Sequence, residues 1–164
     1  MPKVKLTIFG EPMGKQRPKF SRIGGYVKTY TPKDTLNYES VVAHEYREKY
    51  DGMLFTATDQ LVVKIKAFFQ IPKGHYKFYK KLNKVCLDKN GAFMKAGAIR
   101  PTKKPDIDNI AKICLDGLNK IAFVDDSQIV SLIVEKWYCE TPRVEIEIDT
   151  YIDTIIGEHD ENYY

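Results

Sequence analysis

The run RVEIEIDTYI at residues 143–152 alternates strictly between polar and apolar side chains from Arg143 to Asp149. A period of two residues is typical of a β-strand with one face on a core and the other in water. A sheet that contains this strand can carry helices on only one of its faces. The alternation therefore favours a two-layer domain, with helices on one side of a sheet.

Three further segments have the composition of strands, because they are rich in β-branched and aromatic residues: 3–9, 61–71 and 128–138. A helix is expected to start at Thr31-Pro32, with Thr31 as N-cap and proline in the first turn, and to run to Tyr50. A second helix is expected from residue 107, because its apolar side chains form one stripe: Ile107, Ile110, Ala111, Cys114, Leu118 and Ile121. Residues 11–30 predict a loop or irregular hairpin, and 73–104 a short helix followed by a loop.

The order of these elements predicts one α+β domain at residues 1–154, with a mostly antiparallel mixed sheet and helices packed on one side. A chain of 164 residues is long enough to bury one core. We expect residues 155–164, which are acidic and patternless, to be a disordered tail. No apolar run approaches the roughly 20 residues of a membrane span, and the start lacks a secretory signal, so we expect a cytoplasmic protein.

The cysteines are three in number, widely spaced and without a CxxC pair, and the three histidines are equally scattered. Zinc modules need Cys and His ligands at short, regular spacings. The sequence therefore argues against a zinc site, and any metal is expected to have oxygen ligands.

The formal net charge of +4 hides an uneven distribution. Residues 73–104 carry ten bases and one acid, whereas 105–139 carry three bases and six acids. Such a basic stretch can neutralise phosphates and position a nucleic-acid backbone. The candidate DNA contacts are Lys15, Arg17, Lys19, Arg22, Lys73, Lys77, Lys80, Lys81, Lys103 and Lys104. Three aromatic residues among the lysines either stack on unpaired bases or pack their segment onto the body: Tyr76, Phe78 and Tyr79.

Acidic residues flank the helix expected from residue 107. Asp106 and Asp108 stand at its start, and Asp125-Asp126 follows its end. If the next strand lies alongside the helix and returns this pair to the helix start, three carboxylates converge, a set that suits Mg²⁺ or Mn²⁺. Lys112, one turn after Asp108, would face the same side and stabilise charge in phosphoryl transfer.

Each of these residues also has a purely structural explanation. Asp106 is a suitable N-cap, and Asp108 with Lys112 has the spacing of an i,i+4 ion pair. Asp125-Asp126 is suitable for a turn. A DxD pair alone also occurs in other enzyme classes, so only the combination favours a metal site.

The strings PDIDNIAK, ICLDGLN and DDSQIV, with GKQRPKFSR near the start, resemble the RusA family of Holliday junction resolvases, common in bacteriophage and prophage genomes. The resemblance implies catalytic, metal-binding aspartates at Asp106, Asp108 and Asp126 and a functional lysine at Lys112. Asp125 and Asn109 are secondary candidates.

The resemblance also implies a homodimeric, Mg²⁺-dependent endodeoxyribonuclease, with Mn²⁺ as a substitute, that nicks four-way junction DNA symmetrically in recombination and repair. It implies no membrane partner and no small-molecule cofactor. Two other functions stay open: a metal-dependent nuclease for other branched or duplex DNA, and a non-catalytic DNA-binding protein. The basic insertion at 73–100 departs from the shortest family members, and its role stays open too.

Overall fold

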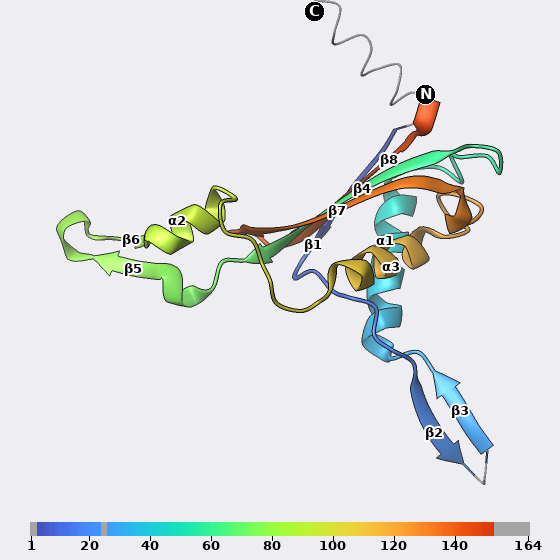
Figure 1. Ribbon diagram of the computed structural model, residues 1–164, viewed down its shortest axis with the longest axis horizontal. Coiled ribbons are helices and arrows are strands. Elements are labelled where there is room, and N and C mark those ends of the chain that lie inside the picture. Colours follow the sequence, from blue (N-terminus) through green and yellow to red (C-terminus); the bar gives the residue numbers. More distant parts are fainter. Residues whose placement is uncertain (1–2, 24–25, 153–164) are drawn as a thin grey trace, which may run out of the picture.

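The computed structural model describes residues 3–23 and 26–152 (Figure 1). A four-stranded sheet in the order β1-β8-β4-β7 forms their centre. It comprises β1 (Val4–Phe9), β4 (Leu61–Gln70), β7 (Ile129–Cys139) and β8 (Arg143–Thr150). β8 pairs antiparallel with β1 and β4, and β4 pairs parallel with β7. The expected mostly antiparallel mixed sheet is confirmed.

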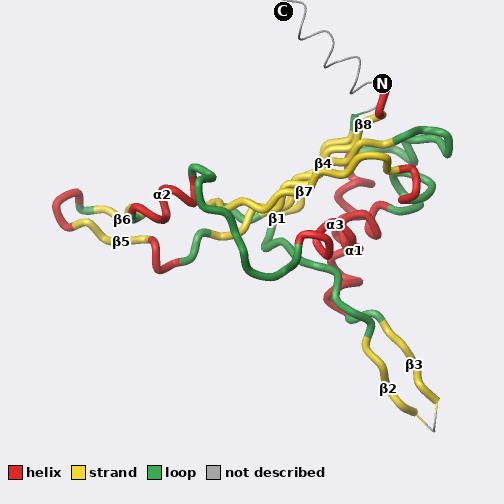
Figure 2. The backbone as a smooth tube through the Cα atoms, viewed as in Figure 1, coloured by secondary structure: helices red, strands yellow, loops and turns green. Residues whose placement is uncertain are grey.

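Two helices, α1 (Lys33–Lys49) and α3 (Ile107–Leu118), pack on one face of this sheet (Figure 2). The alternation in β8 is confirmed, because Val144, Ile146 and Ile148 are fully buried while the residues between them are partly exposed. The structure is therefore the α+β domain that the sequence predicts.

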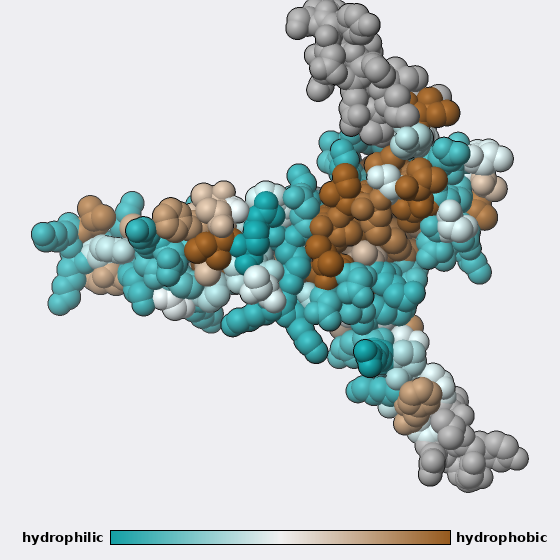
Figure 3. Space-filling model, in the orientation of Figure 1, coloured by the Kyte–Doolittle hydropathy of each residue, from teal (hydrophilic) through white to brown (hydrophobic). Residues whose placement is uncertain are grey.

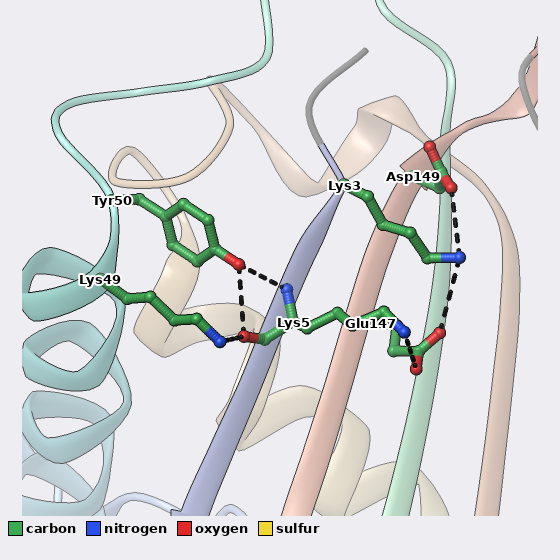
Figure 4. A network of polar contacts seen from close by, with 6 residues as sticks. All are labelled: Lys3, Lys5, Lys49, Tyr50, Glu147 and Asp149. Atoms are coloured by element: carbon green, nitrogen blue, oxygen red, sulfur yellow. Dashed lines mark hydrogen bonds and ion pairs between the residues drawn. The ribbon is translucent and has the colours of Figure 1, made fainter.

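The opposite face of the sheet carries charged side chains in ion pairs (Figure 4). Lys3 Nζ lies 3.6 Å from an Asp149 carboxylate oxygen, and Lys5 Nζ lies 3.4 Å from one of Glu147. On the helix side, Lys49 Nζ donates a 2.7 Å hydrogen bond to the Lys5 carbonyl. β1 is thus joined to β8 by ion pairs and to the end of α1 by a hydrogen bond.

Residues 11–30 contain a hairpin of β2 (Lys19–Ile23) and β3 (Tyr26–Tyr30), which projects from the body (Figure 1). The expected hairpin is confirmed. The expected cap of the following helix is wrong, because Pro32 precedes α1 and no side chain caps it.

The short helix and loop expected at 73–104 are wrong for most of this segment. Two strands, β5 (Tyr76–Tyr79) and β6 (Lys84–Leu87), form an antiparallel hairpin, flanked and joined by the 3₁₀ turns η1 (Lys73–His75) and η2 (Lys80–Leu82). A short helix, α2 (Lys89–Lys95), follows where a loop was expected, and Asp88 caps it by accepting a 2.8 Å hydrogen bond from Gly91 N. We call residues 73–100 the arm.

None of the helices in the described part of the chain is long and apolar enough to cross a membrane. The predicted acidic tail at 155–164 lies outside the described residues.

Candidate active site

The start of α3 presents two carboxylates to solvent. Asp106 is the last residue before the helix, in extended conformation, and its side chain makes no capping hydrogen bond. Asp108 lies in the first turn, and both residues are exposed, as is Lys112. Among the ion pairs of the described residues, none joins Asp108 to Lys112. The two structural explanations of these residues, a cap and an ion pair, are therefore not what the structure shows.

A cleft of about 810 Å³ opens beside Asp106. Residues 12–17 form one wall, and the other wall is formed by Lys104, Pro105, Asp106 and Asn109. Lys15 N donates a 2.8 Å hydrogen bond to the Asn109 carbonyl, which fixes the loop against α3. Gly14 makes this approach possible, because a Cβ there would lie 2.6 Å from the Cβ of Pro105.

Lys15 was expected to contact DNA, but its ammonium is held between two carboxylates. It lies 2.7 Å from Asp116 of α3 and is also paired with Glu39 of α1. Although burial lowers the pKa of Lys15, the hydrogen bonds to Asp116 and Glu39 outweigh this and raise it. Lys15 therefore joins the two helices, and the exposed cations of the cleft are Arg17 and Lys104.

Asp125 and Asp126 precede β7 in a short 3₁₀ turn, η3 (Asp126–Gln128). Asp125 accepts a 2.9 Å hydrogen bond from Ser127 N, while Gln128 Oε1 accepts one from Asp125 N, a reciprocal capping box. Hydrogen bonds from the side chain and backbone of Ser127 lower the pKa of Asp125. The turn explanation thus holds for Asp125, whereas Asp126 is exposed and takes no part in the capping box.

Asp126 lies at the opposite end of α3 from Asp106 and Asp108. Lys136, late in β7, donates a 3.0 Å hydrogen bond to the Pro105 carbonyl beside the start of α3. β7 therefore runs back along α3, and η3, just before β7, lies near the end of the helix. The 12 residues of α3 span about 18 Å.

The expected return of Asp126 to the helix start does not occur within one chain, because the acid stands at the beginning of the returning strand. Accordingly, the described residues contain no group of three His, Cys, Asp or Glu side chains that could hold a metal ion. Asp106 and Asp108 remain as a pair.

The other candidate DNA contacts lie on the two hairpins and the loop beside the cleft. Lys19 lies on β2, and Lys103 lies in the loop from the arm to α3. The arm carries the rest as exposed side chains: Lys73, Lys77, Lys80 and Lys81. Arg22 belongs to β2, but its side chain lies outside the described part.

Sequence reasoning missed Lys136, which holds this loop by bonding the Lys103 and Pro105 carbonyls. A lysine within an apolar strand gives no local signal of such a contact.

Comparison with known proteins identifies the family of the chain. The family model described as endodeoxyribonuclease RusA matches residues 10–149. This range includes both walls of the cleft and the four candidate catalytic residues, Asp106, Asp108, Lys112 and Asp126. The chain is also similar to "Uncharacterized protein YqaN" of Bacillus subtilis (strain 168), with 34% identity over 148 residues that cover 88% of this chain and 94% of the relative. The chain therefore belongs to the RusA family of endodeoxyribonucleases.

Proposed function

We propose that this nuclease is a homodimer that resolves four-way DNA junctions by paired, symmetric nicks, with Mg²⁺ or Mn²⁺ as cofactor, in recombination and repair. The observation that carries the proposal is the exposed pair Asp106 and Asp108 beside a cleft with two exposed cations. The chain on either side of this cleft leads directly into a lysine-bearing hairpin, β2–β3 by way of residues 12–18 and the arm by way of residues 101–105.

The donor set fits a magnesium ion, which takes one or two carboxylates with waters and phosphate oxygens as its other ligands. Asp106 and Asp108 would hold the ion, and their mutual repulsion falls when a cation lies between them. An ion held by Asp106 and Asp108 would provide an activated water and polarisation of the scissile phosphate. Arg17 and Lys104 bind and orient the phosphate backbone in the cleft. Lys112, one turn along α3, offsets negative charge at the helix start.

The edge strand β7 supports a dimer. Residues 129–134, IVSLIV, contain no charge, and the exposed fractions of Val130, Leu132 and Ile133 are 53%, 43% and 46%. Figure 3 shows hydrophobic residues gathered over the part of the sheet where β7 begins. An uncharged edge strand with unpaired backbone groups is a ready site for another strand. A second copy of the same strand is the occupant that a two-fold dimer provides.

Such a dimer would complete the acidic site. If two β7 strands pair antiparallel about a two-fold axis near Ser131, position 126 of one chain lies opposite position 136 of the other. Asp126 of the partner subunit then lies near Lys136, and so near Asp106 and Asp108. Each of the two sites takes two aspartates from one chain and one from the other. A four-way junction has approximate two-fold symmetry, so two equivalent sites suit paired nicks.

Cleavage of three synthetic substrates tests the proposal: a four-way junction, a flap and a linear duplex, each with Mg²⁺ and with EDTA. Paired nicks on the junction alone, dependent on Mg²⁺, are expected. Asp106→Asn should bind the junction but not cut it, while Asp51→Asn, at an exposed acid away from the cleft, should cut normally. Equal cutting of the flap or the duplex would indicate a nuclease with a different substrate. Binding of the junction without cutting by the unaltered chain would indicate a non-catalytic DNA-binding protein.

A further inference from the structure

The β5–β6 hairpin of the arm has two faces that carry different side chains. In the β5–β6 register Phe78 lies opposite Val85, and Tyr79 lies opposite Lys84. Residues opposite each other in an antiparallel pair share a face, and neighbours in sequence alternate. One face therefore carries Phe78 and Val85, and the other carries lysine and Tyr79.

The end of the arm exposes three apolar side chains although it projects into solvent (Figure 1). The exposed fractions of Phe78 and Val85 are both 59%, and that of Leu82 in the connecting turn is 63%. We call Phe78, Leu82 and Val85 the tip surface. Apolar groups gathered on a projecting hairpin contribute nothing to the core, and such exposed patches mark binding surfaces.

The strands and the turn that carry the tip surface are rich in lysine. The exposed lysines of β5, the turn and β6 are Lys77, Lys80, Lys81 and Lys84. The single acid of residues 73–104, Asp88, is engaged at the base of the hairpin, where its carboxylate lies 3.1 Å from His75 Nδ1. An exposed aromatic ring on a lysine-rich hairpin matches a nucleic acid, because lysines bind phosphates and aromatic rings stack on bases. A partner of neutral or basic protein surface would not need these lysines.

The root of the arm is firmly seated. The Arg100 guanidinium lies 2.9 Å from the ring centre of Trp137, and it donates 3.0 Å hydrogen bonds to the carbonyls of Gly97 and Lys136. α2 packs closely on the hairpin, because a Cβ on Gly91 would lie 3.0 Å from His75 and Leu87 side-chain atoms. A pre-positioned element loses little conformational entropy on binding. The contacts at the base of the arm therefore hold the tip surface in a defined position.

Bases within continuous duplex are stacked on each other and offer no free ring face, whereas a branch point exposes bases. We propose that the arm enters the branch point of the DNA, where Phe78 stacks on an exposed base and the neighbouring lysines bind the flanking phosphates. This inference rests on the proposed function, since it names how the same enzyme selects branched DNA. It assigns to the arm a role in substrate selection, separate from the chemistry at Asp106 and Asp108.

A four-way junction with 2-aminopurine at the branch point tests the inference in an Asp106→Asn background, where binding is measured without cleavage. Binding is expected to quench the 2-aminopurine. Adding Phe78→Ala should abolish the quenching and weaken junction binding about tenfold, with duplex binding unchanged. Phe78→Trp should restore quenching, while Phe78→Leu, which keeps an apolar side chain without a ring, should not. Phe9→Ala is the matched control, because Phe9 is exposed on β1 outside the arm.

Trp137, the single tryptophan of the sequence, lies against Arg100 at the base of the arm. Unchanged Trp137 emission therefore verifies that the arm keeps its position in Phe78→Ala and Phe78→Leu. Phe78→Trp is left out of this control because it adds a second tryptophan. Undiminished quenching in Phe78→Ala would overturn the inference. A Phe78→Ala chain that becomes monomeric in light scattering would also overturn it, because the tip surface would then contact a second copy. Junction cutting by the chain with Asp106 intact is measured separately, so its absence counts against the proposed function alone.

Discussion

Two inactive variants should restore activity when mixed, if each active site takes its acids from two chains. In the Asp106→Asn homodimer both sites lack one acid, and in the Asp126→Asn homodimer both lack another. In the mixed dimer one site carries both substitutions and the other carries neither. Random exchange of equal amounts makes about half of the dimers mixed, each with one intact site of two. We expect about a quarter of the wild-type nicking rate, as single rather than paired nicks.

The magnitude follows from the separation within one chain. Oxygens that share a magnesium ion lie within about 4 Å of each other, since each is about 2 Å from the metal. α3 covers about 18 Å, and the strand from Ile129 to Lys136 covers about 23 Å alongside it. Side-chain rotation cannot close that gap. Asp126 therefore either acts in the other subunit's site or takes no part in metal binding.

The assay uses a supercoiled plasmid with an extruded cruciform, on which single nicks relax the DNA and paired nicks linearise it. The control is a mixture of Asp106→Asn and Asp108→Asn, which stays inactive under either arrangement because both residues lie in the same half-site. If the first mixture stays inactive after subunit exchange is demonstrated, the two-chain site is refuted. If Asp126→Asn alone cuts normally, the residue has no role.

Three further predictions concern the cleft and the sheet edge. Lys15→Met leaves Asp116 and Glu39 unpaired at a partly buried site and should lower the free energy of unfolding in urea by about 1 to 2 kcal/mol. The folded-state pKa of Lys15 is raised above 10.5, so its contribution to the free energy of unfolding is complete below pH 10.5. The difference in that free energy between wild type and Lys15→Met should therefore shrink at higher pH. Gly14→Ala should push residues 12–17 away from Pro105, which should reduce junction cutting about tenfold or more and lower the free energy of unfolding by about 1 to 3 kcal/mol. Gly74→Ala is the control, because a Cβ there has open space around it and should change neither quantity. Ile133→Lys should yield a folded monomer that does not cut, by light scattering and cleavage assay, while Leu36→Lys on the exposed side of α1 should stay dimeric.

The layers of the fold are predictable from local periodicity, because a helix or strand that is buried on one face has apolar residues at a regular spacing. The alternation in β8 and the apolar stripe of α3 are both of this kind, and Val144 and Ile110 are buried as each pattern requires. Ile107 is the exception in the stripe, because it is the first residue of α3 and is 45% exposed. The arm was misread because lysine is common in helices and its strands have only four residues each. The order aromatic residue, lysine, aromatic residue from Tyr76 to Phe78 nevertheless has the period of a strand.

Only part of the site is predictable from the sequence, because some of its residues are placed by local backbone and others by contacts between distant segments. Asp106 and Asp108 are two residues apart, so local backbone places them together. The position of Asp126 depends on the direction of β7 against α3, for which the sequence carries no signal. Lys15 shows the same limit, since the carboxylates that neutralise it come from two helices distant in sequence.

Most acids of residues 140–152 also lie where they leave the cleft unaffected. Glu147 and Asp149 pair with Lys3 and Lys5, and Glu145 lies 2.7 Å from Arg143 Nε. These acids lie on the face of the sheet opposite α1 and α3. Because these charges are paired and lie beyond the sheet from the cleft, they oppose DNA binding there only weakly at physiological salt. The net charge of +4 therefore understates the positive potential around the cleft and the two hairpins. We expect DNA to approach from the helix side, where the exposed cations have few acidic partners other than the aspartates of the site.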